Sequence, residues 1–141
     1  MAPPIKPQTK SEATLAPVQT RSAQTRHVQH RGFIFEFLLN NTDTKIIVYS
    51  GALDLLVNTA GTRLWMEHLK WKAKDKWKEA AQEPFSVNSL IEGYVKKADN
   101  LILYIIFRAG HSVPIDNMMA FREMLLQELV YSEMPTSILN K

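Results

Sequence analysis

Two apolar segments decide the fold class: KIIVYSGALD at residues 45–54 and LILYIIFRAGH at residues 101–111. In both segments the apolar residues are consecutive rather than alternating, which is typical of strands covered on both faces, as in a parallel sheet. Each segment ends in a loop, and a stretch with the apolar spacing of a helix follows, at about residues 58–69 and 116–131. The repeated order of strand, loop and helix predicts an α/β fold.

The segments between these units complete the predicted sheet. Residues 70–78 read KWKAKDKWK, and their alternation of lysine with other residues predicts an exposed antiparallel strand. Residues 89–95 are expected to pair with residues 101–107 around the turn at Asp99 and Asn100. Residues 33–39 are too short a run to decide between a helix and a strand. The side chains expected to face inward from the lysine-rich segment are Trp71, Ala73 and Trp77, and those from the last helix are Met118, Phe121, Met124, Leu125 and Leu129.

The ends of the chain differ in composition from the middle. Residues 1–32 hold five basic residues and one acidic residue, a net charge of +4 within a total of +3, so the rest of the chain is close to neutral. This leader is rich in Pro, Gln, Thr and Ser, and we predict that it is disordered. The expected division is a leader at residues 1–32, one α/β domain at residues 33–132 and a frayed tail at residues 133–141.

Composition also bears on partners and cofactors. The 141 residues include no cysteine, which excludes disulfides, thiolate metal sites and a cysteine nucleophile. No apolar run approaches the roughly 20 residues that a membrane span requires, and no secretory signal is apparent, so the destination of the chain is left open. A basic-tailed nucleic-acid binder is a third-ranked hypothesis, because no recognition module accompanies the basic leader, and nucleic acid is not an expected partner.

Asp54 and His111 are the candidate reactive groups, because each lies in a loop beyond a strand that is apolar on both faces. In open α/β sheets, reactive groups collect at the carboxyl ends of the strands. Taken singly, Asp54 reads as a residue that caps its own turn, and His111 as a structural histidine. Taken together, they follow the order Ser…Asp…His of α/β-hydrolases. In that arrangement the carboxylate accepts from imidazole Nδ1–H, and Nε2 is free to take a proton from a nucleophile.

Several motifs in register resemble the C-terminal part of serine carboxypeptidases, nearest the retinoid-inducible or vitellogenic type. They are YSGALD at residues 49–54, GTRLW at residues 61–65, GYV at residues 93–95 and AGHSVPID at residues 109–116, and the likeness covers about residues 36–131. The resemblance implies a C-terminal fragment of an α/β-hydrolase sheet, with parallel strands that carry the Asp and His loops, an antiparallel hairpin and flanking helices. It also implies hydrolysis of peptides from the C-terminus, with Asp54 and His111 as catalytic residues and peptide or protein C-termini as partners.

Three departures from the family pattern matter. Ala52 stands where many members have an acidic or amide residue, and Ser112 replaces a methionine near the leaving-group subsite, which makes Ser112 a candidate substrate-binding residue. The nucleophile motif Gly-x-Ser-x-Gly occurs nowhere in the 141 residues. We therefore expect the chain alone to be inactive, and marginally stable or aggregation-prone. Complementation by a separate N-terminal chain is one hypothesis for its activity. The alternative is a non-catalytic binding protein that keeps the scaffold.

Two minor signals remain. Asn40-Asn41-Thr42 is a glycosylation sequon, so Asn40 is a candidate glycosylation site. The family is lysosomal, vacuolar or secreted, but the leader supports none of these destinations. His27, His30 and His68 have no partners at ligand spacing, so no metal or other cofactor is expected. The sequence gives no indication of oligomeric state.

Overall fold

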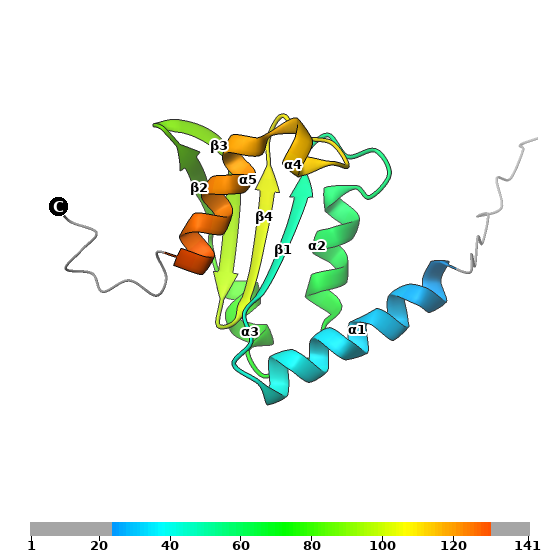
Figure 1. The fold of residues 1–141 in the computed structure, drawn as a ribbon. Coiled ribbons are helices and arrows are strands. Elements are labelled where there is room, and N and C mark those ends of the chain that lie inside the picture. Colours follow the sequence, from blue (N-terminus) through cyan, green and yellow to red (C-terminus); the bar gives the residue numbers. More distant parts are fainter. Residues whose placement is uncertain (1–23, 131–141) are drawn as a thin grey trace, which may run out of the picture.

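A computed structural model describes residues 24–130, which form one four-stranded sheet flanked by helices (Figure 1). The strand order is β1-β4-β3-β2, in which β1 and β4 run parallel and the other two neighbouring pairs are antiparallel. The strands are β1 Ile46–Gly51, β2 Gln82–Val87, β3 Leu90–Ala98 and β4 Leu101–Ile106. The helices are α1 Gln24–Asn41, α2 Thr59–His68, α3 Lys74–Glu79, α4 Val113–Asp116, α5 Met118–Leu125 and the π-helical turn η1 Leu126–Val130.

Strand β4 lies at the centre of the packing, because all six of its residues are buried. Its odd-numbered residues join the apolar cluster that includes side chains from α1, α2 and α3. Its even-numbered residues join a second cluster, with side chains from α4 and α5 on the opposite face. The helices are seen on the two sides of the sheet in Figure 1. The two-sided apolar strand and the α/β class predicted from the sequence are therefore confirmed.

Strands β1 and β4 are direct neighbours in parallel register, from Ile46 opposite Leu101 to Gly51 opposite Ile106. Their carboxyl ends therefore meet at the same edge of the sheet, which places the following loops side by side. The hairpin of β3 and β4 turns at Asp99, as expected from the sequence. Strand β2 is additional to the prediction: it is an edge strand, the place in a sheet where a proline such as Pro84 is tolerated.

The second half of the lysine-rich segment is a helix, and no part of the segment is the predicted strand. Helix α3 spans Lys74–Glu79, and Trp71, Ala73 and Trp77 are buried, as expected of their side chains. The reason is that Ala73 and Trp77 are four residues apart, a spacing that puts two side chains on one helix face as readily as on one strand face. The pattern of alternation alone did not distinguish the two.

The last helical region differs from the single helix expected at residues 116–131. Asn117 caps α5 through its side-chain oxygen, which accepts from the N–H of Ala120, and the helix changes to η1 after Leu125. Met118 and Leu129 are 68% and 57% exposed, contrary to the prediction that both are buried. Glu128 faces the sheet instead: it follows the buried residues Ala120 and Met124 at intervals of four, the spacing that places side chains on one helix face.

The leader also differs in part from the prediction. Residues 24–32, expected to be disordered, form the first half of α1. This helix is anchored at its far end by Leu39, which is completely buried, and by Phe35 and Leu38, which pack against the same cluster. Residues 33–39, which the sequence left undecided, are helical. The predicted disorder of residues 1–23 and the predicted fraying of residues 133–141 lie outside the described residues.

Across residues 24–130, no helix combines the length and the apolar character that a membrane crossing requires.

Candidate functional site

The loops that follow β1 and β4 are joined through their backbones. The N–H of Ala52 donates to the carbonyl of Ile106 at 2.8 Å, and the N–H of Leu53 donates to the carbonyl of Ala109 at 2.9 Å. Gly51 permits this approach, because a Cβ atom at that position would lie 2.7 Å from the carbonyl carbon of Ala109. Glycine at position 51 therefore allows the loop that carries Asp54 to lie against the loop that carries His111.

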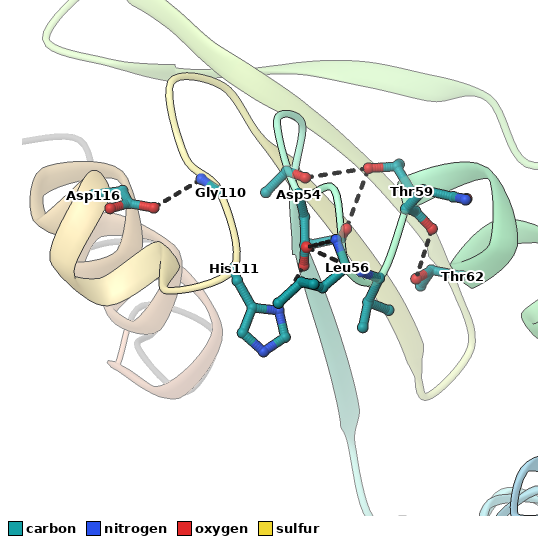
Figure 2. A network of polar contacts seen from close by, with 11 residues as sticks. Asp54, Leu56, Thr59, Thr62, Gly110, His111 and Asp116 are labelled. Carbon is teal, nitrogen blue, oxygen red and sulfur yellow. Dashed lines mark hydrogen bonds and ion pairs between the residues drawn. The ribbon is translucent and has the colours of Figure 1, made fainter. Parts of the chain in front are cut away.

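Asp54 and His111 are in direct contact: Nδ1 of His111 lies 3.0 Å from Oδ2 of Asp54 (Figure 2). The other carboxylate oxygen of Asp54 accepts from two backbone N–H groups, those of Leu56 at 2.8 Å and Val57 at 3.0 Å. The side chain of Asp54 is 7% exposed and that of His111 is 59% exposed. A fixed, covered carboxylate thus holds one nitrogen of an imidazole whose ring faces solvent.

The hydrogen bonds around Asp54 favour its ionised form. The N–H of Val57 lowers the pKa of the Asp54 carboxyl most, and His111 and the N–H of Leu56 act in the same direction. Desolvation opposes them, but the pKa remains below the ordinary value of 3.8. At neutral pH the carboxylate can only accept hydrogen bonds, so a neutral His111 in contact with it carries its proton on Nδ1.

The second ring nitrogen, Nε2, is the atom left for chemistry. Among residues 24–130, no serine or threonine hydroxyl forms a hydrogen bond with His111. A cavity of about 380 Å³ lies next to the pair, between the free edge of β1 and α2, and its lining includes Ser50 and Trp65. The hydroxyl of Ser50 is engaged with that of Thr59, at 3.2 Å. The arrangement can therefore accept a proton at the mouth of this cavity, from a group that the described residues do not provide.

The two lesser candidates lie apart from each other. Ser112 follows His111 directly, is exposed, and makes no side-chain capping bond to α4. Asn40 lies near the end of α1, just before β1, whereas His111 follows β4. Its amide nitrogen donates to the carbonyls of Glu36 at 2.8 Å and Lys70 at 3.0 Å, so attachment of a glycan there requires the loss of one of these bonds.

Metal ligands do not assemble in the part of the chain that the structure describes: residues 24–130 contain no group of three or more His, Asp or Glu side chains placed to hold an ion.

The sequence did not indicate the residues of β3 and of the loop ends that fix the His111 loop on the sheet. Glu92 of β3 is buried, and its carboxylate contacts Arg108 and Asn117, one on each side of His111. The available signal was a lone acidic residue between Ile91 and Gly93, in a segment predicted to pair with the strand at residues 101–107 that is apolar on both faces. A carboxylate in such a place must be paired, because an isolated buried charge is very costly.

Known proteins share both the sequence and the fold. The family model "Serine carboxypeptidase" matches residues 9–130, so the likeness begins before residue 36, where the motifs placed its start. A serine carboxypeptidase-like protein of Oryza sativa subsp. japonica is 33% identical over 90 residues, which are 64% of this chain and 21% of that protein. The human retinoid-inducible serine carboxypeptidase is 40% identical over 76 residues, 50% of this chain and 16% of that protein.

A solved structure agrees in fold. The crystal structure of Kex1(Δ)p, a prohormone-processing carboxypeptidase from Saccharomyces cerevisiae, superposes with a TM-score of 0.58 and 23% identity, over 68% of this chain and 21% of that one. The chain thus spans about a fifth of the length of the relatives that it matches. It corresponds to one part of an α/β-hydrolase sheet, the part with the parallel pair and the antiparallel strands. On the strength of the match over residues 9–130, the chain belongs to the serine carboxypeptidase family.

Proposed function

We propose that this chain supplies the base half of a serine carboxypeptidase active site, with His111 as general base and Asp54 as the residue that orients it. The supporting observation is the 3.0 Å contact between Nδ1 of His111 and Oδ2 of Asp54. A second support is the pair of backbone bonds on Oδ1, which leaves Oδ2 to accept from the imidazole. This is the geometry that an imidazole base requires, with one nitrogen held and the other exposed.

The proposed reaction is cleavage of the last peptide bond of a peptide or protein. Nε2 of His111 takes the proton of a serine hydroxyl as its oxygen attacks the scissile carbonyl, and Asp54 stabilises the imidazolium that forms. The same proton then passes from His111 to the leaving amine, which departs as the C-terminal residue. Water repeats the sequence on the acyl-enzyme. Ser112, next to the base, is the residue of this chain that we assign to the neighbourhood of the leaving group.

The serine itself must come from outside these 141 residues, which contain no Gly-x-Ser-x-Gly segment. Loss of the nucleophile in a Ser-His-Asp enzyme lowers kcat on the order of 10⁶-fold. The donors that stabilise the oxyanion are a separate requirement, whose loss costs about 10²–10³-fold each. We therefore infer that the 141-residue chain is inactive by itself.

Complementation tests the proposal. The chain is mixed with a separately produced N-terminal part of a serine carboxypeptidase, and release of the C-terminal residue from a blocked dipeptide is measured at mildly acidic pH. We expect activity from the mixture alone, and its loss in mixtures made with Asp54→Ala or His111→Ala. Glu83→Ala, on the exposed part of the edge strand β2, is the control that should retain activity. A mixture that forms a complex yet shows no hydrolysis, or a His111→Ala mixture that is fully active, contradicts the proposal.

A second candidate function is a non-catalytic binding scaffold, favoured by the apolar side chains around the Asp54 loop. Leu53, Leu55, Leu56 and Val57 are all exposed. An exposed apolar patch of this kind is a common mark of a protein interface. In this case a partner binds the His111→Ala variant as tightly as the parent chain, and a charged substitution such as Leu55→Asp abolishes binding.

A further inference from the structure

A buried carboxylate lies behind the His111 loop and takes no part in the contact between His111 and Asp54. Glu92 is 5% exposed and belongs to β3, the strand next to β4. Its oxygens have separate partners: Oε1 accepts from the guanidinium of Arg108, and Oε2 accepts from the amide of Asn117 at 2.8 Å. The two partners lie on opposite sides of His111 in the sequence.

These bonds close the loop at its base. The N–H of Phe107 donates to the backbone carbonyl of Glu92 at 2.7 Å, and the amide of Asn117 donates to the carbonyl of Phe107 at 3.0 Å. Arg108 begins the loop and Asn117 ends it, where its side-chain oxygen also caps α5. One carboxylate therefore connects the point where the chain leaves β4 with the point where it enters α5.

The backbone of the loop needs such a connection. Arg108 has a φ of 55°, in the left-handed region that residues other than glycine rarely adopt. A conformation of this kind persists when the surrounding contacts impose it. The side chain of Arg108 is largely exposed, so the ion pair with the buried Glu92 is the contact that directs it inward.

His111 depends on the loop for its position. Its one hydrogen bond within the described residues is that with Asp54, and its ring is otherwise open to solvent. The place of the imidazole is therefore set by the backbone from Ala109 to Asp116. That backbone is held at Ala109 by the N–H of Leu53 and at Gly110 by the carboxylate of Asp116, at 2.8 Å. Both hydrogen bonds require that the two ends of the loop, at Arg108 and Asn117, keep their positions.

We propose that Glu92 is a positioning residue, whose carboxylate ties Arg108 to Asn117 and so keeps the imidazole of His111 against Asp54. The functional meaning of this inference rests on the proposed function, because a general base must hold its imidazole in a fixed orientation. It rests on the structure alone for its test, because the orientation can be measured without a nucleophile. Neither the motifs nor the predicted triad order singled out Glu92.

The test measures the tautomer of His111 in the 141-residue chain. Ring nitrogens are observed by NMR through the carbon-bound ring protons, at alkaline pH where histidine is neutral. His111→Gln identifies the signal among the four histidines. In the parent chain we expect the Nδ1–H tautomer, since Asp54 can only accept, and in Asp54→Ala we expect its loss. Glu92→Gln keeps the volume but replaces one carboxylate oxygen by an NH₂ group, so that either Arg108 or Asn117 loses its acceptor, and the Nδ1–H signature should weaken. In Glu92→Ala it should be lost.

Glu128→Gln is the matched control, because Glu128 is the other buried glutamate of the described residues. It is 4% exposed and bonded to Lys97 and Tyr104, toward the opposite end of β4 from His111. This variant loses stability in the same way but should keep the Nδ1–H signature. Should Glu92→Ala fail to fold, Glu92→Gln and Arg108→Gln decide, since Arg108→Gln removes the ion pair but keeps a residue other than glycine at the left-handed position.

The outcomes separate the two proposals. An unchanged tautomer in folded Glu92→Gln and Arg108→Gln overturns the positioning role, and so does an equal loss of the signature in Glu128→Gln, which would indicate general loosening. A complementation assay without activity contradicts the proposed function but leaves the tautomer result intact. An active mixture whose Glu92→Gln variant is as active as the parent, with an unchanged tautomer, rejects only the role of Glu92.

Discussion

Replacing Gly51 by alanine tests the close approach of the two loops that carry Asp54 and His111. A Cβ atom at position 51 would lie 2.7 Å from the carbonyl carbon of Ala109 and closer still to the carbonyl oxygens of Ala109 and Gly110. Cβ atoms essentially never approach another heavy atom within 3.0 Å, so a strand or a loop must move. The atoms that are met are backbone, and they cannot rotate away as a flexible side chain can.

The expected cost follows from this geometry. Overpacking costs typically 1–3 kcal/mol, and a clash with backbone falls at the upper end, at about 3 kcal/mol. Alanine stiffens the unfolded chain relative to glycine, which returns roughly 0.7 kcal/mol. The net loss in the free energy of unfolding is then about 2 kcal/mol. With a slope of about 1.5 kcal/mol per molar urea, the unfolding midpoint falls by about 1.3 M.

Urea unfolding followed by circular dichroism measures the effect, and Gly32→Ala is its matched control. Gly32 is buried in α1, where the nearest atom to an added Cβ is Nε1 of Trp65, at 4.0 Å. Alanine favours a helix interior over glycine by about 0.5–1 kcal/mol, so this variant should unfold at a higher urea concentration than the parent. The same chemical change is therefore expected to have opposite signs at the two positions.

An unchanged midpoint in Gly51→Ala refutes the reasoning. It would mean that the end of β1 and the backbone at Ala109 and Gly110 are farther apart than described, and the contact of Asp54 with His111 would lose its structural basis. A lower midpoint in Gly32→Ala as well would show that the loss at Gly51 is not specific to the junction of the loops.

Two further predictions concern a helix cap and pH. Asn58→Ala should lower the free energy of unfolding by about 1 kcal/mol, measured by urea unfolding, because its side-chain oxygen accepts from the N–H of Gly61 at 2.6 Å and caps α2; an unchanged midpoint contradicts the cap. Burial acts to raise the pKa of Glu128, but hydrogen bonds from Lys97 and Tyr104 outweigh it and hold the pKa below its ordinary value of 4.5. A carboxyl with a lowered folded pKa stabilises the fold above its unfolded pKa and loses that contribution as pH falls, so stability should decrease below about pH 4.5. Glu128→Gln should reduce this dependence, and an identical pH profile in parent and variant contradicts the assignment.

Much of the fold was predictable from local patterns. Consecutive apolar residues at 46–49 and 101–107 identified the two strands that are covered on both faces, because such a pattern leaves no polar side for solvent. The order of elements then indicated parallel neighbours with loops at one edge. The family motifs were specific enough to pair Asp54 with His111 before any coordinates, and the distance between them agrees with that expectation.

Other features were ambiguous in the sequence for identifiable reasons. Residues 70–78 fit a strand and a helix equally well, because Ala73 and Trp77 share a face in both. The burial of Glu128 instead of Leu129 depends on donors from β3 and β4, Lys97 and Tyr104, which are distant in the sequence. The first half of α1 continues a helix that is anchored farther along, by Leu39.

The sequence by itself determined the α/β class, the family and the two residues expected to share a proton, since these depend on short contiguous patterns. Only the tertiary structure decided which charged groups are buried and what holds the His111 loop. Glu92 contacts Arg108 and Asn117, which are 16 and 25 residues away in the sequence. A pattern of neighbouring residues cannot predict contacts over such separations. A buried carboxylate is acceptable only where distant strands and helices bring donors to it, and that condition belongs to the folded chain as a whole.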